Sequence, residues 1–149
     1  KYFKGKVQQV TQYLITLKQE VNLVYKEPSD RMYSNESTLL SNVMKWLAPQ
    51  QRDGIKALRI CDRYHKGYSD IFICAKGRFV VVELKDDKGT ATLHQKLFIK
   101  EMQNAGAIGG ICRTVKDVAN LINEALYCKC NIEHDAAHKY CPICGKLIL

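Results

Sequence analysis

The stretch 67–85 constrains the fold of this chain more than any other part of its sequence. Two runs of apolar residues, most of them β-branched or aromatic, lie on either side of Gly77. This pattern is typical of two short strands joined by a tight turn. Because successive side chains of a strand point to opposite faces, Glu83 and Lys85 would share one face. The hairpin would also bring Asp70, which precedes the first strand, beside them.

The predicted hairpin therefore gathers two carboxylates and one ammonium at one edge of a sheet. Such a set can hold a divalent cation against a phosphate. Taken singly, each charged residue has a simpler explanation, because Asp commonly begins a turn and charged side chains commonly mark the point where a buried strand reaches water.

The segments on either side of the hairpin complete an α/β pattern with one mixed sheet. In chain order we expect an amphipathic helix in 1–27, a helix from Ser34 or Asn35 to before Pro49, a strand over 55–60, the hairpin, a helix capped by Thr90 or Thr92, a strand over 108–112 and a helix from Val115. The strand–helix–strand unit late in the chain predicts a parallel pair with a right-handed crossover. The three earlier strands, joined by short turns, should be antiparallel.

Two polar residues of these helices are expected near the charged edge. Glu36 lies in a predicted first turn, where the helix dipole alone explains an acid. Gln95 would lie close to the end of the second hairpin strand if its helix packs back on the sheet. The inner face of that helix is predicted to consist of Leu93, Leu97, Phe98 and Met102.

The composition is that of an ordinary globular chain with an excess of positive charge. The 149 residues allow one core and a small appendage, and 46% are hydrophobic. The net charge of +8 favours a polyanionic partner, most simply nucleic acid. No apolar run approaches the roughly 20 residues of a membrane helix, and no signal-peptide pattern is present. We therefore expect a cytoplasmic protein without a membrane partner.

Seven cysteines suggest a reducing compartment and a zinc site. Cys61, Cys74 and Cys112 lie in apolar segments and are expected to be reduced core residues. The other four form two knuckles near the C-terminus, the second with the sequence Cys-Pro-Ile-Cys-Gly. Four thiolates in two such turns predict a structural zinc ribbon over 127–149. Its predicted ligands are Cys128, Cys130, Cys141 and Cys144, with His134 or His138 as an open alternative for one of them.

A basic and aromatic loop precedes the hairpin. Such a loop can hold a phosphate backbone and stack on an exposed base, or can simply be solvated. The candidate DNA-binding residues are Arg63, Tyr64, His65 and Lys66 in this loop, with Lys88 and His94 farther along the chain.

Together these residues resemble the PD-(D/E)xK nuclease superfamily. Asp70 stands in the Asp position, after Ser69 rather than Pro, and Glu83-Leu84-Lys85 is the Glu-x-Lys element. The leading acid Glu36 and the trailing Gln95 have the order found in the VRR-NUC branch. Stand-alone members of that branch occur in phages, and larger relatives are structure-specific repair nucleases. The resemblance covers about 33–118 and leaves out the cysteine-rich tail.

The resemblance implies a restriction-endonuclease-like domain over 28–126, between an N-terminal helix in 1–27 and the zinc ribbon in 127–149. It implies that Asp70, Glu83, the backbone carbonyl of Leu84 and Glu36 bind Mg²⁺ or Mn²⁺. Lys85 would orient or help deprotonate the attacking water and offset charge on the phosphate. Gln95 would position Lys85 or a water molecule.

The function predicted on this basis is a metal-dependent, structure-selective DNA endonuclease. A homodimer that resolves Holliday junctions is the form that stand-alone relatives suggest, in a phage-encoded or nucleoid-associated protein. Two alternatives stay open: a nickase that acts on flaps or processes ends, and, from another class, a non-catalytic nucleic-acid-binding zinc protein. RNA is a further candidate substrate.

Overall fold

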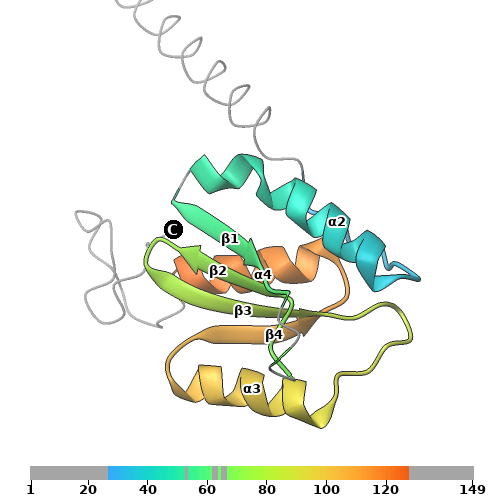
Figure 1. Ribbon diagram of the computed structural model, residues 1–149. Helices are drawn as coiled ribbons and strands as arrows, with labels where there is room; N and C mark the ends of the chain where they lie inside the picture. Colours follow the sequence, from blue (N-terminus) through green and yellow to red (C-terminus); the bar gives the residue numbers. More distant parts are fainter. Residues whose placement is uncertain (1–26, 53, 62–63, 65–66, 128–149) are drawn as a thin grey trace, which may run out of the picture.

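A four-stranded mixed sheet lies at the centre of the computed structural model, which describes residues 27–52, 54–61, 64 and 67–127 (Figure 1). Its strands follow the order β1-β2-β3-β4, with β1, β2 and β3 antiparallel and β4 parallel to β3. The elements are α2 (Glu36–Leu47), the 3₁₀ helix η1 (Pro49–Arg52), β1 (Ile55–Arg59), β2 (Ile71–Ala75), β3 (Arg78–Leu84), α3 (Leu93–Asn104), β4 (Ile108–Cys112) and α4 (Val115–Leu126). The predicted α/β class and mixed sheet are confirmed.

The hairpin turn fixes the register that builds the site. Lys76 and Gly77 both have positive φ, at 48° and 82°, as a two-residue turn of the type favoured by right-twisted strands requires. The register pairs Ile71 with Val82. One step farther along both strands, Asp70 therefore lies next to Glu83.

The face of the sheet that packs against α2 and α4 forms the main core. Leu39, Val43 and Leu47 come from one side of α2 at helical spacing and are fully buried. The side chain of Asn35 caps this helix by accepting from the backbone N–H groups of Ser37 and Thr38. This cap fixes the first residue of the helix, which is Glu36.

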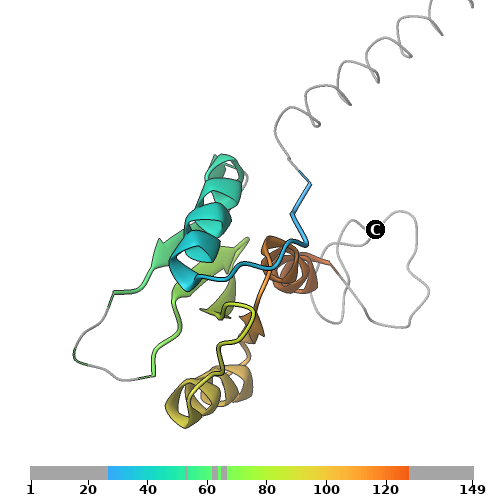
Figure 2. The same ribbon diagram turned by 90° about the vertical axis from the view of Figure 1, so that its right-hand side faces the viewer.

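The opposite face carries α3 over its β3–β4 half, so that α3 and α4 lie on opposite sides of the sheet (Figure 2). The Phe98 ring packs against Phe72 of β2 and against Tyr68, with centroid distances of 5.9 and 4.9 Å. Ile99 is the buried residue of this helix. The ring contacts hold α3 against β2 and the segment that precedes it.

The predicted inner face of α3 is partly wrong. Leu93 and Leu97 are 69% and 51% exposed, whereas Phe98 and Met102 are partly buried. Compared with the predicted orientation, the helix is rotated about its axis so that the Gln95 side chain reaches Glu83 at the buried end of β3. Leu93 and Leu97, one turn apart, consequently face away from the sheet.

Two of the three cysteines predicted in the core are exposed. Cys112 is buried at the end of β4, and its burial raises the pKa of the thiol. Cys74 lies on the face of β2 opposite the main core, since its neighbours Ile73 and Ala75 are buried in that core, and α3 leaves this part of the face exposed. Cys61 follows β1 in the loop and is also exposed.

Some predictions concern residues outside the described part of the chain. These are the N-terminal helix, the zinc ligands Cys128, Cys130, Cys141 and Cys144 with the alternatives His134 and His138, and the loop residues Arg63, His65 and Lys66. No helix in the described ranges is long and apolar enough to cross a membrane.

Close packing between β3, β4 and α3 leads to a first prediction. An alanine at Gly109 would overlap Val81 Cγ2 and lie 3.3 Å from Ile99 Cγ2. We expect Gly109→Ala to lower the free energy of unfolding by about 1–3 kcal/mol in chemical denaturation, because overpacking forces backbone or side-chain shifts. Gly110→Ala is the matched control, since its methyl would meet Leu121 at 3.4 Å. Equal losses in both variants would contradict the packing argument.

Candidate active site

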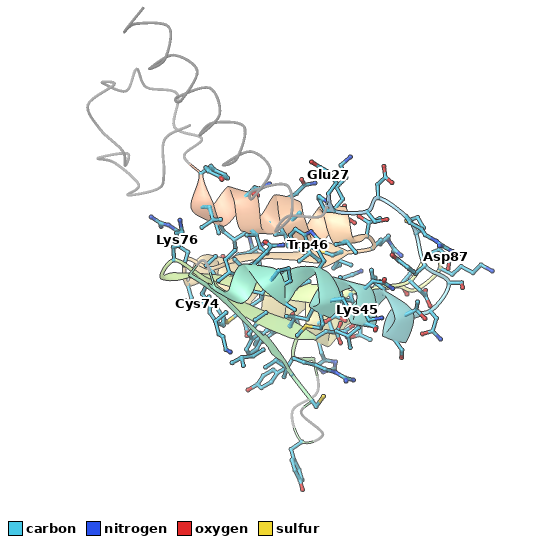
Figure 3. The ribbon with its side chains drawn as sticks, turned by 90° about the horizontal axis from the view of Figure 1, so that it is seen from above. Glu27, Lys45, Trp46, Cys74, Lys76 and Asp87 are labelled. Carbon is cyan, nitrogen blue, oxygen red and sulfur yellow. The ribbon has the colours of Figure 1, made fainter. Side chains whose placement is uncertain are left out.

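Five side chains predicted from the sequence meet at one end of the sheet. Glu36 begins α2, Asp70 precedes β2, Glu83 and Lys85 lie at the end of β3, and Gln95 is in the first turn of α3. This end lies away from the hairpin turn: Asp87, two residues beyond Lys85, is far from Lys76 in Figure 3. The pairing of β3 with β4 continues to this end of the sheet, because the Lys85 N–H donates to the Cys112 carbonyl and so fixes the backbone of Lys85.

Lys85 connects two of the acids. Its Nζ lies 2.8 Å from Glu83 Oε1 and 3.2 Å from Glu36 Oε1. The lysine is 7% exposed, so its ammonium is largely removed from water. A buried charge of this kind requires close partners, and the two carboxylates supply them.

Glu83 is fully buried and only half satisfied. Its Oε1 accepts from Gln95 Nε2 as well as from Lys85. Its Oε2 has no hydrogen-bond partner within the described part of the chain. Burying a carboxylate oxygen without a partner lowers the stability of the fold. Such an oxygen is therefore available to accept a hydrogen bond or to bind a cation.

Gln95 is fixed from both ends. Its backbone N–H donates to Thr92 Oγ1, and its Oε1 accepts from the Thr92 N–H at 2.9 Å, which forms a capping box. Its amide nitrogen is left to donate to Glu83. The structure thus places Gln95 on Glu83, whereas the family resemblance implied contact with Lys85 or water.

Asp70 is held by the end of β3. Its Oδ2 accepts from the Leu84 N–H at 2.7 Å, while the Leu84 side chain is buried in the main core. The bond fixes the carboxylate beside the backbone of the Glu-x-Lys element. The predicted role of the Leu84 carbonyl as a metal ligand stays a prediction.

The proton affinities of these groups are shifted by burial and by their neighbours. Burial raises the pKa of Glu83 to about 7, although the hydrogen bond from Lys85 opposes this. Burial also raises the pKa of Asp70, against the Leu84 N–H and the Lys85 charge. Burial would lower the pKa of Lys85, but the bonds to Glu83 and Glu36 outweigh it and the net pKa is raised. Near neutral pH, Lys85 is therefore protonated, and the Glu83 carboxyl beside it is partly protonated.

The donor set fits a hard divalent cation. It consists of carboxylate oxygens, one of which is buried and unpaired. Within the described ranges, no three acidic, cysteine or histidine side chains are arranged as a ready-made metal site. The ammonium of Lys85 holds two of the acids instead. The chemistry of the site suits the ion, and Lys85 competes with it for the same oxygens.

The candidate DNA-binding residues that are described lie on the surface. Lys88 and His94 are exposed, in the loop after β3 and in the first turn of α3. Gly67, at φ +99°, packs so closely that a Cβ there would lie 2.7 Å from His94 Cβ. Tyr64 is 92% exposed in the β1–β2 connection. These positions are compatible with contact to a long ligand, and their role stays a prediction.

Two further contributors to the site were not predicted. A Cβ at Gly89 would lie 3.1 Å from Glu36 Oε1 and 3.3 Å from Lys85 Cδ. Arg113, after β4, donates to the carbonyls of Asp86 and Gly89. Neither residue carries a sequence signal, because a glycine after two acids simply predicts a turn and a single arginine after a strand predicts nothing specific.

Comparisons with known proteins give one similar structure. No protein-family model matches the chain, and no curated protein matches it. A solved structure described as "VRR_NUC domain" is 19% identical, with a TM-score of 0.48, and the match covers 59% of this chain and 94% of that one. Its description carries the name of the family that the sequence resembles. What this chain can do is inferred below from its own side chains.

Proposed function

We propose that this protein is a metal-dependent nuclease that hydrolyses phosphodiester bonds in DNA. The observation that carries the proposal is the pair of acids Glu36 and Glu83 on one buried lysine, with Asp70 held beside them at Leu84, in which Glu83 keeps an unpaired carboxylate oxygen. If this site only stabilised the fold, we would expect that oxygen to have a hydrogen-bond partner, or an apolar residue to occupy the position of the acid. Perturbed titratable groups that converge at one end of a sheet are typical of catalytic sites.

Asp70, Glu83 and Glu36, with the Leu84 carbonyl, would hold Mg²⁺ or Mn²⁺. When bound, such an ion supplies Lewis-acid stabilisation of the phosphate and acidifies a water molecule. Gln95 would keep the Glu83 carboxylate in one orientation through the hydrogen bond that its side-chain amide donates to Oε1. The Leu84 N–H would do the same for Asp70.

Lys85 would act as a cation rather than as a base. Its raised pKa keeps the ammonium protonated at neutral pH. A fixed, largely buried ammonium can donate to a phosphate oxygen and stabilise the charge that develops there. Of the two roles implied by the family resemblance, this favours the offset of phosphate charge over proton removal.

The net charge of +8 supports a nucleic-acid substrate, and DNA is the class that the family resemblance implies. Branched DNA cut by a homodimer is the finer form of the proposal, since two sites related by a two-fold axis suit a symmetric four-way junction.

The proposal is tested by cleavage of labelled four-way junction, flap, single-stranded and duplex DNA, and of one RNA duplex, with Mg²⁺, Mn²⁺ or EDTA. Asp70→Asn is the inactive comparison. Metal-dependent cuts that are absent in Asp70→Asn support a nuclease, and paired cuts in the junction support the resolving dimer. Cleavage of flaps or duplex alone supports the end-processing form. Tight binding without cleavage under any metal would reduce the protein to a nucleic-acid-binding module.

A further inference from the structure

The loop 86–89, which follows Lys85, is tied down at three points. The Asp86 side chain accepts from the backbone N–H groups of Lys88 and Gly89 within the loop. The Asp87 N–H donates to the Tyr33 carbonyl, three residues before Glu36. Arg113, which follows β4, donates to the backbone carbonyls of Asp86 and Gly89. A short exposed connection held by this many bonds is more ordered than its length requires.

Arg113 reaches the loop with both arms of its guanidinium. One terminal nitrogen donates to the Asp86 carbonyl, and the other donates to the Gly89 carbonyl at 2.8 Å. The Arg113 backbone N–H donates to Asp117 Oδ2, which also takes part in the cap of α4. Arg113 makes no ion pair with the acids of the described ranges. Its guanidinium therefore acts as a fork that clamps two carbonyl groups.

The clamped loop is in contact with the reactive groups through Gly89. The space for a side chain at Gly89 is taken by Glu36 Oε1, the Lys85 chain and Asp86 Oδ1, all within 3.3 Å of an added Cβ. Glu36 Oε1 is the same atom that binds Lys85 Nζ at 3.2 Å. A shift of this loop by a few tenths of an ångström therefore changes the room available to that ion pair.

We propose that Arg113 is a positioning residue of the active site. It fixes the loop 86–89, whose Gly89 backs the Glu36–Lys85 pair, and so sets where the ammonium stands relative to Glu83. The inference rests on the nuclease activity proposed above. The main alternative is that Arg113 contributes only positive charge toward nucleic acid.

Arg113→Lys separates these two roles. Lysine keeps the charge but cannot donate to two carbonyls in a fixed fork. We expect kcat for the best DNA substrate to fall about 10- to 100-fold, as for residues that orient catalytic groups, with KM changed less than about twofold. Lys100→Ala, which removes an exposed lysine from α3, is the matched control and should change only the salt dependence of binding. A variant Arg113→Lys with wild-type kcat would overturn the proposal.

A double-mutant cycle tests whether Arg113 acts through Gly89. Gly89→Ala introduces a methyl group against Glu36 and Lys85 and should reduce kcat by itself. If both residues act on the same ion pair, the double variant loses clearly less than the product of the two single losses. Independent, multiplicative losses would contradict the pathway through the loop.

Hydrogen exchange keeps the inference testable apart from the activity. The Gly89 N–H, bonded to Asp86 Oδ1, should exchange at least about tenfold faster in Arg113→Lys, at a temperature where both proteins stay folded. If wild type cuts no nucleic acid, the proposed function fails, and the inference is then judged by calorimetric titration with Mn²⁺. Faster exchange with weaker Mn²⁺ binding would retain Arg113 as the residue that positions the acids. Unchanged exchange and unchanged Mn²⁺ binding would overturn it.

Discussion

Replacing Lys85 by alanine is expected to lower the rate of DNA cleavage by at least about 1,000-fold. The ammonium is the cation that lies between Glu83 and Glu36 in the described structure, at 2.8 and 3.2 Å. Its removal takes away the charge proposed to face the phosphate. It also leaves Glu83 buried without its cation, so the pKa of that carboxyl should rise further and metal binding should weaken. Single-turnover cleavage at saturating protein measures the effect.

The affinity of the Lys85→Ala variant for DNA should stay within about threefold of wild type, because a buried lysine contributes little to the surface charge that binds the phosphate backbone. Lys56→Ala is the control, since Lys56 is an exposed lysine of β1. It should retain the cleavage rate. Circular dichroism must first show that both variants are folded. Wild-type cleavage by a folded Lys85→Ala protein would show that the reaction does not use this site.

The core of the site was predictable because it depends on local rules. A turn at Gly77 sets the register of β2 and β3, and strand alternation puts Glu83 and Lys85 on one face. The cap at Asn35 sets the start of α2 and with it the position of Glu36. These elements follow from patterns within a few residues of each other.

What could not be predicted depends on contacts between distant parts of the chain. Arg113 lies 27 residues from the Asp86 carbonyl to which it donates. The rotation of α3, which exposes Leu93 and Leu97, follows from the bond between Gln95 and Glu83 across 12 residues. Helical spacing alone allows several apolar faces, and only the tertiary bond selects one.

Sequence patterns also fail where a strand has one face uncovered. The segment around Cys74 is apolar throughout, which is typical of a strand buried on both sides. In the structure α3 lies over β3 and β4 and reaches β2 at Phe72, while Cys74 is exposed. The extent of cover depends on where the crossover helix lies, and a single sequence carries little information about that.

Glu83→Gln should abolish cleavage and, in the absence of metal, stabilise the protein at alkaline pH. The pKa of Glu83 is about 7 in the folded protein, against 4.5 for an ordinary glutamate. Between these two pH values the folded chain binds a proton that the unfolded chain has released, so stability is greatest below pH 4.5 and falls as pH rises through 7. By about pH 8 the loss is about 3 kcal/mol. Glutamine does not titrate. The free energy of unfolding of Glu83→Gln should therefore equal that of wild type at low pH and exceed it by about 3 kcal/mol at pH 8.

A divalent cation should remove most of this difference, and its removal distinguishes a metal site from a carboxylate that is merely buried at a cost. With Mn²⁺ at about 100 times its Kd, wild type should gain about 2.7 kcal/mol at pH 8 and recover most of its deficit, whereas Glu83→Gln should gain much less. Below pH 7 the gain of wild type should shrink, because the ion must displace the proton that Glu83 then holds. Chemical denaturation with and without Mn²⁺ across this range measures both effects. Equal stabilisation of the two proteins by Mn²⁺ would exclude Glu83 as a ligand, and a variant no more stable than wild type at pH 8 without metal would show that Glu83 is not held near its proton in the fold.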